Sequence, residues 1–126
     1  AVDDVSAIET RLGRAAVDGH RTKPDGTDIR WKQIGVLGTL EDRQLPFFIE
    51  WIENHHPSTD GKAVATIVKV EIAGDEATIT NYLGSDTAKA LGDNVEVVWL
   101  SPADNDGENG IVAVHLNTPS GVVRLD

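Results

Sequence analysis

Residues 63–73, which read AVATIVKVEIA, decide the fold of this chain. Apolar side chains recur there at every second position, which is the period of a β-strand that buries one face. The positions predicted to share this face are Val64, Thr66, Val68, Val70 and Ile72. We therefore expect the second half of the chain to open with a strand.

A helix and three further strands are predicted after this stretch. Residues 74–92, GDEATITNYLGSDTAKALG, have an acidic cap and favour one short helix. The apolar runs NVEVVWLSP, GIVAVHLN and GVVRLD favour strands over residues 94–102, 110–117 and 121–126. The acidic run ADNDGENG and the turn TPSG separate these strands. The predicted order of this half is therefore βαβββ.

The first half repeats part of this order. Val5, Ile8 and Leu12 have the spacing of a half-buried helix, predicted over residues 4–17. The glycines and the proline of DGHRTKPDGTD then predict a loop. Two strands, DIRWKQIGV and LPFFIEWI, are predicted at residues 28–36 and 45–52, followed by the linker IENHHPSTDGK at 52–62.

An internal repeat relates the two halves. A shift of 71 residues matches Asp4 with Asp75, Ile8 with Ile79, Leu12 with Leu83 and Gly13 with Gly84. Shifts of 65 and 66 residues then align the two predicted strands of the first half, DIRWKQIGV and LPFFIEW, with the predicted strands NVEVVWLSP and GIVAVHL of the second half. The alternative is a chance match of two amphipathic helices. If the repeat holds, the first module is incomplete, because only three residues precede its helix.

The composition limits the classes of partner. The 126 residues suit one domain, and the net charge of −10 repels nucleic acid and anionic lipid. The chain has no cysteine and no long apolar run, which excludes disulfides, thiolate zinc sites and a membrane-spanning segment. The first ten residues lack the pattern of a signal peptide, so we expect a cytoplasmic protein with neither nucleic-acid nor membrane partners.

The motifs RTKPDGTDIRW at 21–31, LPFFIEW at 45–51 and the following His-Pro resemble the glyoxalase-like domain proteins. That family lies in the vicinal oxygen chelate superfamily, with glyoxalase I, the bleomycin-resistance proteins and the extradiol dioxygenases. The resemblance covers nearly the whole chain, which looks like the C-terminal portion of such a protein. It implies an α+β fold in which paired βαβββ modules form a cupped, mostly antiparallel sheet. The implied domain spans residues 1–126, with an incomplete first module at 1–62 and a complete module at 63–126.

The same resemblance raises the question of a metal. Glyoxalase I and the dioxygenases hold a divalent cation with a His or Gln on the first strand of a module and a carboxylate on the last. Here Ala65, Thr66 and Ile67 surround the first of these positions, and Arg124 or Leu125 takes the second. None of these side chains can bind a cation. We therefore expect neither a metal nor another cofactor.

Strand alternation identifies a candidate catalytic pair. Along residues 110–116 it sends His115 towards the cup, and along LPFFIEW it sends Phe48 and Glu50 there and leaves Ile49 and Trp51 on the helix side. A carboxylate and an imidazole that face one concavity can act as a base and its partner. The alternative is that Glu50 and His115 form a structural pair or that one lies at the surface.

Further residues are candidates for ligand binding. Aromatic rings line small-molecule sites when they are not core residues, and a guanidinium binds an anionic group. The predicted ligand-binding residues are Trp31, Phe48, His55, His56, Trp99 and Arg124. For the histidines the alternative is a loop at the rim of the pocket, and for the tryptophans it is core packing.

Three functions are consistent with the resemblance and with these candidate residues. The first is binding of a small polar organic ligand in the cup, with lyase or isomerase chemistry that needs no metal. The second is a non-catalytic module that sequesters a ligand, as the bleomycin-resistance proteins do, and the third is a structural or assembly domain with a vestigial cup. An open sheet edge is a liability, so we also expect a homodimer or completion by further N-terminal sequence.

Overall fold

The computed structural model describes residues 1–52, 56 and 61–126. The chain divides into two compact units. Unit 1 comprises Ala1–Thr39 and Phe47–Lys62, and unit 2 comprises Leu40–Pro46 and Ala63–Asp126. The single domain predicted over residues 1–126 stays a prediction.

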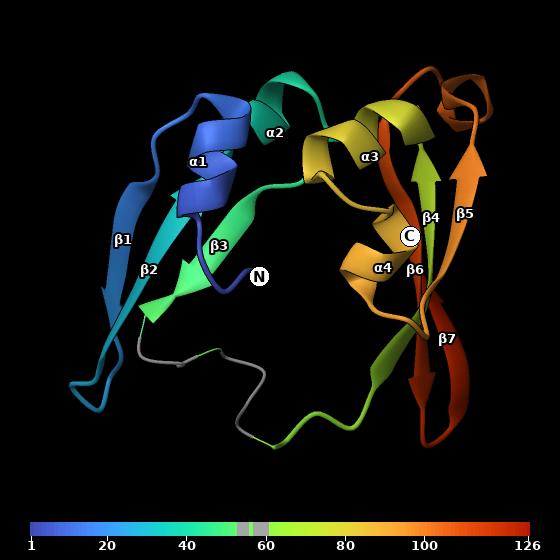
Figure 1. Ribbon diagram of the computed structural model, residues 1–126. Coiled ribbons are helices and arrows are strands. Elements are labelled where there is room, and N and C mark those ends of the chain that lie inside the picture. Colours follow the sequence, from blue (N-terminus) through green and yellow to red (C-terminus); the bar gives the residue numbers. More distant parts are fainter. Residues whose placement is uncertain (53–55, 57–60) are drawn as a thin grey trace. The chain divides into compact units, whose positions relative to one another are not determined.

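Unit 1 contains a three-stranded antiparallel sheet and one helix beside it (Figure 1). The strands lie in the order β1-β2-β3. The elements in chain order are α1 (Ser6–Leu12), β1 (Val17–Thr22), β2 (Asp28–Ile34), α2 (Gly38–Glu41), which spans the boundary with unit 2, and β3 (Phe48–Trp51).

Unit 2 contains a four-stranded sheet in the order β5-β4-β6-β7 (Figure 1). The β4–β5 pair is parallel and the other pairs are antiparallel. Its elements are β4 (Thr66–Ala73), α3 (Glu76–Leu83), α4 (Thr87–Leu91), β5 (Glu96–Leu100), the 3₁₀ turn Pro102–Asn105, β6 (Gly110–Thr118) and β7 (Gly121–Leu125). The predicted α+β class with mostly antiparallel sheets is confirmed. Within residues 1–52 and 61–126 no helix combines the length and apolar character that crossing a membrane requires.

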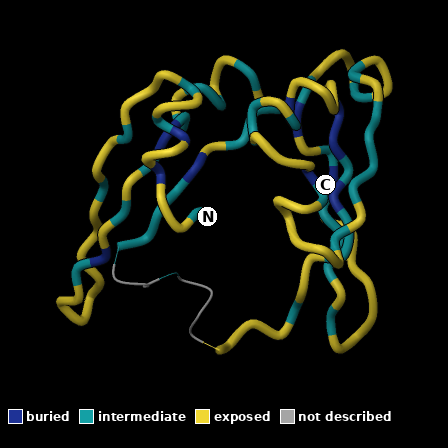
Figure 2. The backbone as a smooth tube through the Cα atoms, in the orientation of Figure 1, coloured by how far each residue is buried: buried dark blue, intermediate teal, exposed yellow. Residues whose placement is uncertain are grey.

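The core of unit 2 lies between α3 and one face of its sheet. Val70 and Ile72 of β4 are 4% and 6% exposed and form a buried cluster with Ile79 of α3. Figure 2 shows the buried positions of this unit along its strands. Partly buried apolar residues complete the cluster: Leu83, Val95, Val97 and Trp99. Trp99 therefore packs on the helix-covered face, and its predicted position in the cup is wrong.

The single helix predicted at residues 74–92 consists of two helices. Asp75 begins α3 by accepting a hydrogen bond from the backbone N–H of Thr78 at 2.9 Å. Gly84, with φ of 73°, then adopts the left-handed conformation that ends it. Asp86 caps the next helix through the N–H of Lys89 at 3.1 Å. The break between the two helices therefore follows from local residues: a glycine ends α3 and a second acidic cap begins α4.

Strand β1 lies where the sequence predicted a loop. It pairs with β2 over six residues, from Val17 with Gln33 to Thr22 with Asp28. The ring of Trp31 lies against Gly19, and a Cβ at Gly19 would be 2.4 Å from that ring. Gly19 therefore lies inside the strand, where its missing side chain leaves room for the ring of Trp31, and it does not end the strand.

The predicted facing of β3 is wrong. Phe48 is 6% exposed with the guanidinium of Arg11 from α1 above its ring, and Glu50 accepts a hydrogen bond from the N–H of Val5 at 2.9 Å. Phe48 and Glu50 therefore lie on the α1 side of the sheet. Trp51 lies on the opposite face, against Trp31. Consecutive apolar residues in LPFFIEW fit either facing, so local alternation could not decide it.

Candidate functional site

A charged cluster lies on the face of the unit 2 sheet that is opposite α3. Alternation places Lys69 and Glu71 of β4 on this face, because Val70 and Ile72 point into the core. The strand register then places His115 of β6 directly opposite Lys69 and pairs Arg124 of β7 with His115. Three neighbouring strands therefore bring their polar side chains together.

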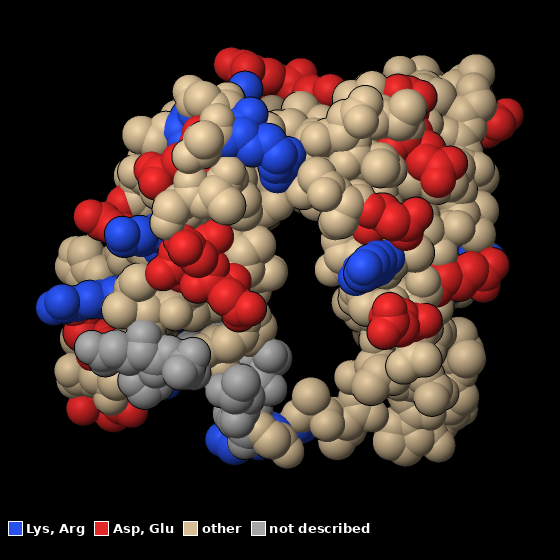
Figure 3. Space-filling model, viewed as in Figure 1, with Lys and Arg blue, Asp and Glu red and all other residues tan. Residues whose placement is uncertain are grey.

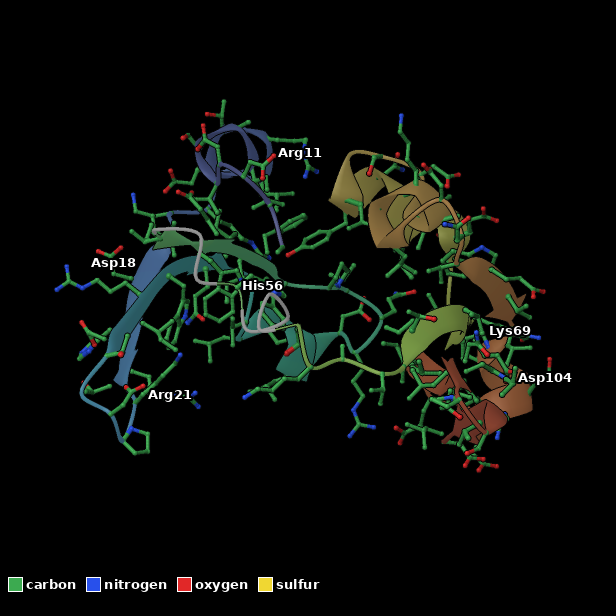
Figure 4. The ribbon with its side chains drawn as sticks, turned by 90° about the horizontal axis from the view of Figure 1, so that it is seen from below. Arg11, Asp18, Arg21, His56, Lys69 and Asp104 are labelled. Carbon is green, nitrogen blue, oxygen red and sulfur yellow. The ribbon has the colours of Figure 1, made fainter. Side chains whose placement is uncertain are left out.

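Glu71 is the centre of this cluster. Its Oε1 lies 2.7 Å from Nε2 of His115, and its Oε2 accepts a hydrogen bond from a guanidinium nitrogen of Arg124 at 3.2 Å. The ammonium of Lys69 lies 4.0 Å from Oε1. The side chains of Glu71 and His115 are only 16% and 18% exposed, which limits competition from water. Figure 4 shows Lys69 beside the strands of unit 2.

The contacts favour the charged forms of Glu71 and Arg124. The hydrogen bond with His115 and then that from Arg124 lower the pKa of Glu71 below its ordinary value. The hydrogen bonds to Glu71 and then to Asp126 raise the pKa of Arg124. The carboxylate is therefore ionised and the guanidinium charged. The cations Lys69 and Arg124 face the carboxylates of Glu71 and Asp126.

An imidazole beside a carboxylate can carry a proton, because the carboxylate stabilises the protonated ring. Strand alternation paired His115 with Glu50 and did not identify Glu71. The signal was present in TIVKVEIA, where Glu71 alternates with the two buried residues Val70 and Ile72. The carboxylate of Glu50 instead accepts the backbone N–H of Val5 beside α1.

The aromatic candidates of unit 1 lie on the face opposite α1. The ring centroids of Trp31 and Trp51 are 5.6 Å apart and the planes are tilted by 53°. The indole N–H of Trp31 donates to Gln33 at 3.0 Å, and the ring of His56 meets Trp51 edge-on at 5.6 Å. Figure 4 labels His56. His55 lies outside the described residues.

Unit 1 also has an open depression of about 540 Å³ beside Trp31. Polar and charged side chains of β1 and β2 surround it. Among them, Asp28 contacts His20 at 3.4 Å and forms an ion pair with Arg30 at 3.0 Å. Those contacts lower the pKa of Asp28, with the hydrogen bond from Arg30 as the largest cause. His20 itself is 74% exposed, so this surface is well solvated.

The side chains around Glu71 do not fit a divalent cation. Glu71 and His115 supply two ligand types, but Arg124 and Lys69 place positive charge within 4.0 Å of the same carboxylate. In the part of the chain that the structure describes, no three His, Asp or Glu side chains gather as a metal site would require. The expectation of no metal and no cofactor stays a prediction.

Comparison with known proteins identifies a family. A family model described as a glyoxalase-like domain matches residues 1–87, which include Glu71 but neither His115 nor Arg124. No curated protein and no solved structure matches the chain.

Proposed function

Because the chain belongs to the glyoxalase-like domain family, we propose that unit 2 binds a small polar organic ligand on the sheet face opposite α3. The observation that supports this proposal is the bridge that Glu71 makes between His115 and Arg124. Small-molecule sites combine a few convergent polar groups with a rigid scaffold, and three paired strands supply that scaffold here.

The cluster favours a polar ligand that carries no more than one negative charge. Arg124 is already paired with Glu71 and Asp126, so its positive charge is largely balanced. A guanidinium has five N–H donors, and donors remain for a ligand oxygen. We therefore expect Arg124 to contribute a hydrogen bond to the ligand, as one contact among several, and not to act mainly as the partner of a negative charge.

The chemistry proposed for this site is proton transfer of the lyase or isomerase type. His115 would take a proton from the ligand, and the neighbouring carboxylate of Glu71 would stabilise the resulting imidazolium. Neither step requires a metal. Binding without chemistry uses the same contacts, so a binding measurement is the first test.

The test is a titration of ¹⁵N-labelled protein with glycolate, a small hydroxylated acid. Amide signals of β4, β6 and β7 should shift in the wild type, and His115→Ala should weaken binding about tenfold, the loss of one hydrogen bond of about 1.4 kcal/mol. His20→Ala is the matched control, because His20 is an exposed histidine of unit 1. Shifts confined to unit 1, or equal affinity of His115→Ala and wild type, would contradict the proposal.

A second candidate function follows from the aromatic pair of unit 1. Trp31 and Trp51 offer two tilted rings to an aromatic ligand, as expected of a non-catalytic sequestering module. Phenol is the probe for this candidate. Binding of phenol that is lost in Trp51→Ala and unchanged in His115→Ala would favour sequestration over proton transfer. A domain that binds neither probe would contradict both candidates and favour the structural role.

A further inference from the structure

Glu71 and His115 meet at one defined nitrogen of the imidazole ring. Nε2 of His115 lies 2.7 Å from Oε1 of Glu71, a normal hydrogen-bond distance. An ionised carboxylate only accepts hydrogen bonds. The hydrogen atom of this contact therefore belongs to Nε2 whenever Glu71 is ionised.

The surroundings keep Glu71 ionised and fix its position. Arg124 donates to its second oxygen at 3.2 Å and Lys69 lies 4.0 Å from the first, so the carboxylate is held by cations from two strands. These contacts agree with the lowered pKa of Glu71. Asp126, the other carboxylate of the cluster, pairs with Arg124 and leaves His115 to Glu71.

The second ring nitrogen of His115 has no such contact. Within residues 1–52, 56 and 61–126, Nδ1 of His115 makes no hydrogen bond. A neutral imidazole with its hydrogen on Nε2 carries a lone pair on Nδ1. Nδ1 is therefore the ring nitrogen that can accept a hydrogen bond from a ligand.

We infer that Glu71 is a positioning residue that holds His115 as the Nε2–H tautomer, so that Nδ1 accepts a hydrogen bond from an O–H or N–H group of the ligand. The existence of a ligand rests on the proposed function, and the inference adds its class, a hydroxylated or amino compound. If the proton moves, the ligand oxygen or nitrogen keeps the electron pair of the broken bond. Nδ1 gains the proton, and the imidazolium keeps its Nε2–H bond to Glu71.

The tautomer is tested in the free protein by nuclear magnetic resonance. Long-range ¹H–¹⁵N spectra of the imidazole rings distinguish a protonated from an unprotonated nitrogen, and His115→Asn identifies the signals of His115. We expect the wild type to carry its hydrogen on Nε2, with a ring N–H signal protected from exchange. Glu71→Ala should lose that signal and give averaged nitrogen shifts.

Glu76→Ala is the matched control, because Glu76 is an exposed glutamate on α3. It should leave the ring signals of His115 unchanged, whereas a general effect of removing a carboxylate would move them. A hydrogen on Nδ1 in the wild type would overturn the inference, and so would unchanged ring signals in Glu71→Ala. If Glu71→Ala does not fold, Glu71→Gln keeps the size of the side chain and should populate both tautomers, because an amide can donate as well as accept.

The ligand class is tested with glycolate and methoxyacetate, which share a charge and differ in that a methyl group replaces the hydroxyl hydrogen. Glycolate should bind about tenfold more tightly, a difference of about 1.4 kcal/mol. Equal affinities would overturn the donor requirement. If neither acid binds while the Nε2–H tautomer depends on Glu71, the positioning role is supported and the proposed function fails.

Discussion

Glu71 shows how a single residue can connect three strands. It lies on β4, accepts from Arg124 of β7 and contacts His115 of β6, while its neighbours Val70 and Ile72 point into the core. Its carboxylate does not need burial in a cavity to be held in place, because cations flank it on the sheet surface. The same contacts give a measurable dependence of stability on pH.

Replacing Glu71 with Gln should flatten the acid side of the stability curve. The pKa of Glu71 is lowered in the folded state from 4.5, so between the folded and unfolded pKa values the unfolded chain binds more protons. Glu71 therefore stabilises the fold above about pH 4.5, and this contribution is lost as the pH falls through the folded pKa.

Urea unfolding from about pH 3 to pH 6 measures this difference. The other carboxylates with lowered pKa values, such as Asp75 and Asp28, are present in both proteins and cancel. The wild type should lose more stability than Glu71→Gln over this interval. Parallel curves would show that the contacts of Glu71 do not persist in solution.

At the scale of elements, β1 depends on one close contact. The ring of Trp31 fills the space beside Gly19, where an added Cβ would lie 2.4 Å from the indole. Gly19→Ala should therefore destabilise unit 1 by about 1–3 kcal/mol, the usual cost of overpacking. Unfolding followed by tryptophan fluorescence measures it. Asp18→Ala is the control on the same strand, and a stabilised Gly19→Ala would contradict the packing.

The segment 40–46 is an integral part of unit 2. Gln44 accepts a hydrogen bond from the N–H of Asp75 at 2.9 Å, where α3 begins, and Arg43 forms an ion pair with Glu108. Gln44→Ala should lower the stability of unit 2 by about 1 kcal/mol. Chemical unfolding followed by the amide signals of α3 measures this loss. Glu41→Ala, an exposed change in the same segment, should have almost no effect.

At the scale of the whole molecule, the charge and the sheet edges are the features that bear on association with a second chain. Acidic side chains are distributed over the surface of both units (Figure 3), in agreement with the net charge of −10. Strand β7 is one of the two edges of the unit 2 sheet, and each of its five residues is exposed. Apolar residues on an exposed edge favour pairing with another chain.

We therefore propose that the isolated chain forms a homodimer through β7. Val122 and Leu125 are 64% and 53% exposed on this edge, and pairing would remove them from water. Val122→Lys should weaken the dimer, because a charge on an edge strand opposes pairing. Sedimentation velocity over a range of concentrations measures the change. A wild-type chain that is monomeric throughout that range would refute the proposal.

Local patterns accounted for much of the fold. Alternation in residues 63–73 and the apolar runs that follow predicted the strands of unit 2, and the acidic cap at Asp75 predicted the start of α3. The same alternation placed His115 on the face opposite α3, where the structure has it. These features depend on residues close in sequence, so the sequence alone was sufficient to predict them.

The periodicity of the sequence predicted the succession of strands along unit 2 and the side of β6 on which His115 lies, and the family resemblance implied the α+β class. Tertiary structure alone decided that Glu71, not Glu50, contacts His115, that Phe48 and Glu50 face α1, and that β1 is a strand. Each of these depends on the register between strands or on a ring packed across them. A register joins residues far apart in the chain, and a shift of one residue reverses every side chain, so no local pattern contains it.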